Sequence, residues 1–72
     1  MNLWQAEEGL EYIVDRIESE DEELERFLFS LGCYGGEPIT VVMRRGKLLI
    51  VSIKDGRYSV DRRLAENILL KA

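Results

Sequence analysis

Apolar residues follow a helical spacing in the first half of the chain. Positions i, i+3, i+4 and i+7 of one segment are apolar, which is the spacing of one face of an α-helix: Leu24, Phe27, Leu28 and Leu31. Ser19 with Glu22 three residues later is typical of a capping box, and Gly32 directly follows the last apolar position. The pattern therefore predicts a helix that Ser19 caps and Gly32 ends.

Beyond Pro38 the pattern changes to the two-residue period of β-strands. Residues 48–54 alternate, with Leu49, Val51 and Ile53 on one face. The predicted strands are residues 39–43, 48–54, 57–60 and 68–70. Asp55-Gly56 is the strongest turn signal and predicts a type I′ hairpin turn. Asp61 is expected to cap a single helical turn over residues 62–66.

The segment from residue 10 to 19 has two interpretations. Leu10, Ile13, Val14 and Ile17 fit a helical stripe, but the β-branched residues among them also suit a strand. Several short strands separated by turns in so few residues indicate a small barrel. A barrel would need this segment as a strand, because the sheet would otherwise leave an edge open.

The charge of this 72-residue chain is unevenly spread around a formal net value of −4. Residues 1–25 carry ten acidic side chains and one basic one, whereas residues 26–72 carry nine basic and four acidic ones. A chain of this length is expected to form a single domain over residues 1–72, with a small core and no deep active site. The longest apolar runs are far too short to cross a bilayer and no signal peptide is visible, so a cytoplasmic location without membrane insertion is expected.

The sequence offers little for catalysis or metal binding. It contains no histidine, the commonest general base and metal ligand, and a single cysteine. Cys33 follows a helix C-terminus, where the dipole disfavours a thiolate, so it is expected to be a packed residue. The acidic run over residues 18–25 is interpreted as a solvated face that favours the start of the helix. We therefore predict no catalytic residue, metal ligand or cofactor, and the protein is not expected to be an enzyme.

The turn between helix and strand is the best candidate for an interaction site. Three glycines within residues 31–36 indicate that the path of the backbone is specified there, and an aromatic side chain in such a turn can anchor a partner. The predicted partner-binding residues are Leu31, Cys33, Tyr34, Gly35 and Gly36.

The order of these segments resembles the ferrous iron transport protein A (FeoA) family. The segments that carry the resemblance are residues 11–17 (Glu-Tyr-Ile-Val-x-x-Ile), 24–32, 36–42 and 51–60, followed by Ala65 and Ile68. The resemblance implies a mostly β fold: a small SH3-like β-barrel with an α-helix inserted after the first strand and a short helical turn before the last strand. It also implies a strand near residues 12–17.

The same resemblance implies a function and a partner. The family is associated with the membrane ferrous-iron transporter that carries a cytoplasmic GTPase domain. Its members are thought to be small cytosolic accessory or regulatory proteins, so this chain is expected to be a monomer or weak oligomer that reaches the membrane through its partner. Two positions differ from the usual family pattern: Phe27 stands where arginine is common, and Gly35 where proline is common.

Two other functions fit the sequence less well. A direct transition-metal-binding or sensing domain would need more ligands than one cysteine offers. A nucleic-acid-binding barrel would need its cations on one face: Arg44, Arg45, Lys47, Arg57, Arg62 and Arg63. The acidic first third of the chain would repel phosphates, so no nucleic-acid partner is expected.

Overall fold

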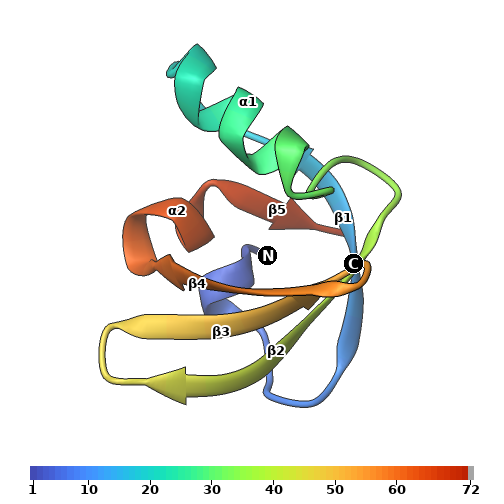
Figure 1. The fold of residues 1–72 in the computed structure, drawn as a ribbon, viewed down its shortest axis with the longest axis vertical. Helices are drawn as coiled ribbons and strands as arrows, with labels where there is room; N and C mark the ends of the chain where they lie inside the picture. The colour runs from blue at the N-terminus through green and yellow to red at the C-terminus, as the bar shows by residue number, and fades with distance from the viewer. Residues whose placement is uncertain (72) are drawn as a thin grey trace.

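The computed structural model describes residues 1–71 as a mostly β fold with short helices (Figure 1). In chain order the elements are the 3-10 helix η1 (Leu3–Gln5), β1 (Glu11–Ile17), α1 (Glu22–Ser30), β2 (Pro38–Arg45), β3 (Leu48–Ile53), β4 (Gly56–Asp61), α2 (Arg62–Glu66) and β5 (Ile68–Leu70). This order confirms the predicted SH3-like arrangement, with a helix after the first strand and a helical turn before the last.

The five strands form one antiparallel sheet in the order β4-β3-β2-β1-β5. β1 pairs with both β2 and β5, so the segment that periodicity left open is a strand, as the family resemblance implied. Within residues 1–71 no ladder joins β4 to β5, so the sheet curls without closing, and α2 connects these two edge strands. In Figure 1, α1 projects at one end of the molecule, away from β2 and β3.

Two irregularities in the ladders help the sheet to curl. One lies between Val14 and Arg16 of β1 and the other between Val41 and Met43 of β2. A β-bulge bends its strand and increases the local twist. The first half of β1 pairs with β2 and the second half with β5, so the bend in β1 lies where the strand changes partner.

The core consists of one set of apolar side chains enclosed by the curled sheet, η1 and the helices. The predicted inner face of β3 is confirmed, because Leu49, Val51 and Ile53 are all buried. The other buried residues are Leu3, Ala6, Val14, Leu28, Cys33, Ile39, Val41, Val60, Ala65, Ile68 and Leu70. Partly buried aromatic and aliphatic side chains surround this set and complete the core: Trp4, Tyr12, Ile17, Leu24, Tyr58 and Leu64.

The predicted helix cap at Ser19 is wrong by two residues. The N-cap of α1 is Asp21, whose Oδ1 accepts hydrogen bonds from the amides of Glu23 (3.0 Å) and Leu24 (3.3 Å). Ser19 acts one step earlier, because its hydroxyl oxygen accepts a hydrogen bond from the Asp21 amide (3.0 Å). The predicted cap of α2 is confirmed, since Asp61 Oδ1 accepts a hydrogen bond from the Leu64 amide (2.9 Å).

The hairpin between β3 and β4 turns one residue earlier than predicted. Ile53 pairs with Gly56, so the two loop residues are Lys54 and Asp55, and Lys54 has a φ of 51°. Gly56 is already in β4 and has no positive φ, so a type I′ turn over Asp55-Gly56 is wrong. Glycine leaves room there for the ring of Tyr58, which would have to shift if this position carried a Cβ.

Helix α1 packs less tightly than its apolar stripe predicted. Within Glu22–Ser30, Leu28 is the one fully buried side chain. Phe27 belongs to the predicted buried stripe but is 51% exposed, and Phe29 is 64% exposed. The stripe is therefore wrong at Phe27, because α1 stands at the end of the barrel and contacts it mainly through its last turn.

Candidate functional site

The end of α1 is a complete Schellman motif. Gly32 has a φ of 90°, its amide donates to the carbonyl of Phe29 (3.0 Å), and the amide of Cys33 donates to the carbonyl of Leu28 (2.9 Å). These are the two hydrogen bonds that define the motif. The side chains of Cys33 and Leu28 are both buried, which is the apolar contact that usually accompanies it. The predicted stop at Gly32 is therefore confirmed.

The chain then makes a tight turn over residues 34–37. The amide of Glu37 donates to the carbonyl of Tyr34 (3.1 Å), and Gly36, with a φ of 92°, occupies the third position, where a type II turn requires positive φ. The amide of Gly36 donates to the carbonyl of Val14 (2.8 Å), and the amide of Val14 donates to the carbonyl of Glu37 (2.9 Å). Hydrogen bonds to β1 therefore hold the turn in place.

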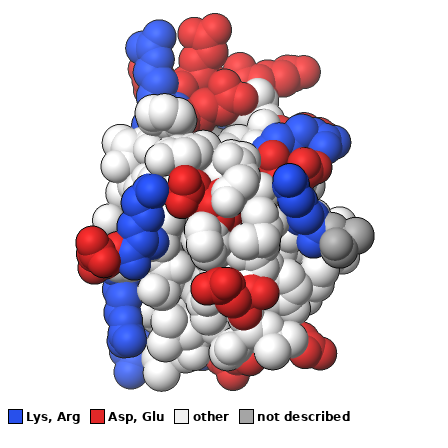
Figure 2. All heavy atoms as spheres, turned by 90° about the vertical axis from the view of Figure 1, so that its right-hand side faces the viewer, with Lys and Arg blue, Asp and Glu red and all other residues white. Residues whose placement is uncertain are grey.

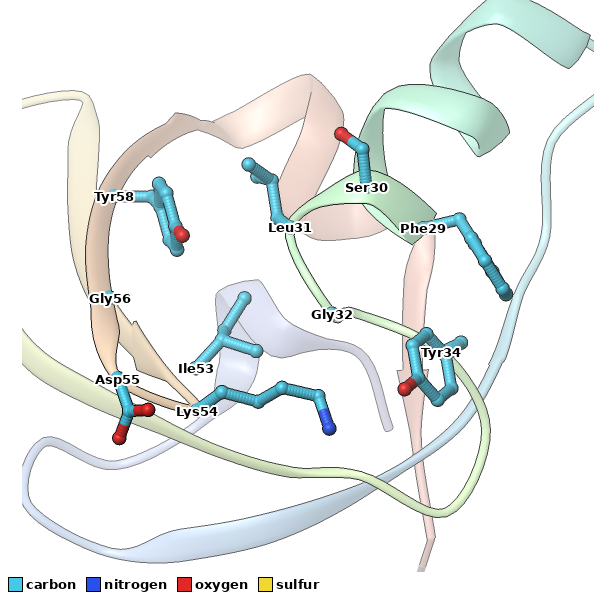
Figure 3. Close-up of a pocket in the computed structure, with 10 residues that line it drawn as sticks. All are labelled: Phe29, Ser30, Leu31, Gly32, Tyr34, Ile53, Lys54, Asp55, Gly56 and Tyr58. Atoms are coloured by element: carbon cyan, nitrogen blue, oxygen red, sulfur yellow. The ribbon is translucent and has the colours of Figure 1, made fainter.

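A groove lies between this segment and the β3–β4 hairpin (Figure 3). Its walls are the last turn of α1 on one side and the start of β4 on the other. The residues that line it are Phe29, Ser30, Leu31, Gly32, Tyr34, Ile53, Lys54, Asp55, Gly56 and Tyr58. Figure 3 shows Leu31 opposite Tyr58 and above Ile53, with Tyr34 and Phe29 at the other end of the groove.

Lys54, in the loop of the β3–β4 hairpin, contacts the turn that follows α1. Its Nζ lies 3.1 Å from Oε2 of Glu37 and 5.4 Å from the ring centroid of Tyr34. Hydrogen bonding to Glu37, and secondarily to Tyr34, raises the pKa of Lys54. Its methylenes cross Gly32, where a Cβ would lie 2.9 Å from Cδ of Lys54. Gly32 thus ends the helix and also leaves room for the lysine.

Two aromatic rings form one end of the groove. The rings of Phe29 and Tyr34 have centroids 4.8 Å apart and are tilted by 31°, a packed aromatic pair. Phe29 remains 64% exposed and Tyr34 is half-buried. The pair therefore presents apolar surface to solvent on a backbone that the Schellman motif and the turn keep rigid.

The structure separates the five predicted binding residues into two kinds. Leu31 and Tyr34 line the groove, and Gly35 and Gly36 are exposed in the turn beside it. Cys33 is buried in the core, and desolvation by this burial raises the pKa of its thiol to about 11. Cys33 therefore belongs to the core beside the site, and it has no exposed surface that a partner could contact.

Sequence reasoning missed Lys54, Tyr58 and Phe29 as residues of this groove. Lys54 and Tyr58 lie more than twenty positions after Leu31 and reach the groove because the β3–β4 hairpin folds back toward α1. Phe29 lies off the predicted helical stripe, and no local pattern in the sequence indicated that its ring would pack on Tyr34.

The basic residues are distributed over other parts of the surface. Arg44 and Arg62 lie over the ring of Trp4, each with its guanidinium carbon 5.3 Å from a ring centroid. Arg44 also donates hydrogen bonds to the carbonyls of Trp4 (2.6 Å) and Ala6 (2.6 Å), so it holds η1 against β2. Figure 2 shows acidic side chains gathered at one end of the face it presents, basic side chains along both sides, and a middle that is mostly uncharged apart from a few acidic side chains.

The described residues contain neither a metal cluster nor a spanning helix. Among residues 1–71, no three His, Cys, Asp or Glu side chains lie together so that they could hold a metal ion. In the same part of the chain, no helix has the length and apolar character needed to cross a membrane.

Comparison with known proteins places the chain among small SH3-like domains. Stenotrophomonas maltophilia FeoA complexed with zinc, described as a procaryotic SH3 domain protein, superposes with a TM-score of 0.89 at 20% identity, covering 99% of this chain and 89% of that one. A second FeoA structure, an iron uptake regulatory protein, gives a TM-score of 0.88 at 22% identity, covering 99% and 95%. A manganese-dependent transcriptional repressor gives 0.84 at 24% identity, covering 94% of this chain and 39% of the repressor.

These structures share the fold at low sequence identity, and the family assignment rests on the sequence itself. No curated protein matches the chain significantly. The family model for the FeoA domain matches residues 1–72. The chain therefore belongs to the FeoA family.

Proposed function

We propose that this protein is a cytosolic accessory protein of ferrous iron uptake that binds the membrane ferrous-iron transporter and its GTPase domain. Membership of the FeoA family supports the link to iron uptake. The structural relative from Stenotrophomonas maltophilia is described as a candidate ferrous iron transport activating factor, which agrees with such a role. The binding site is the groove between the end of α1 and the β3–β4 hairpin, with Leu31, Tyr34, Gly35 and Gly36 at its rim.

The exposed aromatic pair at the groove is the observation that carries this proposal. Phe29 and Tyr34 pack on each other and still leave most of Phe29 in solvent. Isolated surface apolar residues are common, but an aromatic pair beside a groove on rigid backbone is typical of the anchors that dominate interface energies. Lys54 adds a charged donor at the same place, held by Glu37.

The test is chemical-shift mapping of the isotopically labelled protein with the soluble GTPase domain of the transporter. We expect the largest shifts at Leu31, Tyr34, Gly35 and Gly36, with smaller ones in the β3–β4 hairpin. The same protein is also mixed with the whole transporter in detergent. Absence of binding to both forms would rule out the proposal.

Two phenylalanines of α1 provide a matched pair of variants. Phe29→Ala removes the aromatic anchor and should weaken binding at least about thirty-fold, since truncating an anchor residue typically costs about 2 kcal/mol or more of binding free energy. Phe27→Ala removes a similarly exposed ring that does not line the groove. It should change the affinity by less than about three-fold. Equal effects of the two variants would place the interface elsewhere on α1.

A further inference from the structure

The two edges of the sheet are treated differently. The outer edge of β5 is covered by the start of the chain, since Asn2 forms a bridge with Leu69 and the amide of Leu70 donates to the carbonyl of Met1 (2.8 Å). The outer edge of β4 has no backbone partner within residues 1–71. An uncovered edge strand is a template for pairing with another strand.

The register of the hairpin shows which backbone groups this edge exposes. The two-residue loop makes Ile53 and Gly56 the hydrogen-bonded pair that closes the hairpin, and the β3–β4 ladder then runs to its end without a bulge. Hydrogen-bonded and non-hydrogen-bonded pairs alternate along an antiparallel ladder. Gly56, Tyr58 and Val60 therefore bond to β3, whereas Arg57 and Ser59 direct their amide and carbonyl groups outward.

The charges along this edge are complementary to a second copy of the same strand. Arg57 and Asp61 lie two positions before and two positions after Ser59. If a second β4 lies antiparallel with Ser59 opposite Ser59, then Arg57 of each copy lies opposite Asp61 of the other. Both residues are exposed, and neither takes part in an ion pair among residues 1–71.

From this geometry we infer that two copies of the protein associate through the outer edge of β4, antiparallel and centred on Ser59. The hydrogen-bonding parity agrees with this register, because Ser59 and Arg57 both expose the groups that such a ladder needs. Opposite charges face one another across the contact twice, as expected for a two-fold interface in which the same patch serves both copies. Charges that normally protect an edge by repulsion here attract.

The contact is short, so the dimer is weak. The area buried between two six-residue strands with two cross-strand ion pairs is far smaller than the area of a stable, permanent interface. The half-buried ring of Tyr58 adds apolar contact on the core side of the new ladder. The dimer is therefore expected to form only when the protein concentration is well above micromolar and approaches millimolar.

Sedimentation of the full chain alone over this concentration range tests the inference. The wild-type protein should show a concentration-dependent dimer. Arg57→Asp turns both attractive pairs into pairs of like charge and should weaken the dimer at least about ten-fold. Arg45→Asp makes the same change of net charge at another exposed position on β2 and should leave the dimer within about two-fold of the wild type.

A mixing experiment tests the symmetry directly. Arg57→Asp and Asp61→Arg should each associate poorly alone, but their mixture should form a heterodimer in which every cross-strand pair is attractive. Asp61→Arg also removes the cap of α2, so its folding is checked by circular dichroism. If it does not fold, Asp61→Asn, which keeps a capping oxygen, should weaken the wild-type dimer.

Three results would overturn the inference. The first is a wild-type protein that stays monomeric at millimolar concentration. The second is a dimer that Arg57→Asp and Arg45→Asp weaken equally. The third is a mixture of folded single variants that shows no heterodimer. Because the test uses the chain alone, its outcome is independent of transporter binding.

Discussion

Gly35 shows how one residue controls the placement of the turn beside the groove. Its φ is not in the positive range, so backbone freedom does not explain glycine at this position. A Cβ there would lie 2.7 Å from the carbonyl oxygen of Asp15, a distance that real Cβ atoms essentially never show. The obstacle is backbone atoms of β1 and cannot rotate away. The absence of a Cβ at Gly35 thus allows an unusually close approach of the turn to β1.

Replacing Gly35 by asparagine should therefore destabilise the protein. We expect a loss of about 1–3 kcal/mol in the free energy of unfolding, the usual cost of forcing atoms into occupied space. Gly46→Asn is the matched control, because its Cβ would meet nothing within 4 Å and asparagine tolerates a φ of 60°. The positive φ of Gly46 strains any L residue, so this variant should also lose some stability, but less than Gly35→Asn because no atoms overlap. Urea denaturation of both variants makes the comparison, and equal losses would contradict the steric explanation.

At the scale of elements, α1 depends most on its ends. Its middle buries a single side chain, Leu28, so packing contributes less than in an ordinary core helix. The Asp21 cap and the Schellman motif provide hydrogen-bond partners for backbone groups at both ends of the helix. Three acidic residues in the first turn stabilise the helix further, because they interact favourably with its dipole. The sequence predicted the C-terminal end correctly because Gly32 directly follows the last apolar position of the stripe. It misplaced the N-cap because both Ser19 and Asp21 can cap.

The cap assignment leads to a prediction about these two residues. Asp21→Ala should remove both hydrogen bonds to the first turn and lower the free energy of unfolding by about 1 kcal/mol. Ser19→Ala should cost less than half as much, because its hydroxyl bonds one amide outside the helix. Helical circular dichroism and urea denaturation of the two variants test this order. A larger effect at Ser19 would restore the capping box that the sequence pattern indicated.

At the scale of the whole molecule, the sequence pattern predicted the barrel well and the groove poorly. Alternation, which depends on neighbours along the chain, identified the inner face of β3. Periodicity alone left β1 open, and the resemblance to the FeoA family indicated that it is a strand. The groove depends on the approach of the β3–β4 hairpin to the end of α1, which joins Lys54 to Glu37 and Tyr34. That approach follows from the curl of the sheet, and no local pattern encodes it.

Cys33 connects the stability of the whole domain to pH. It is buried where α1 joins the barrel, and desolvation raises its pKa from an ordinary value of 9.0 to about 11. Between these two pH values the unfolded chain loses the thiol proton and the folded chain retains it. The buried neutral thiol therefore contributes fully to the free energy of unfolding below pH 9. This contribution, about 2 kcal/mol, is lost as the pH rises toward 11.

Cys33→Ala should show a smaller fall in unfolding free energy between pH 8 and pH 11 than the wild type, measured by urea denaturation. Because other groups titrate in the same range, the comparison is between the two slopes. Equal slopes would show that the thiol is not responsible.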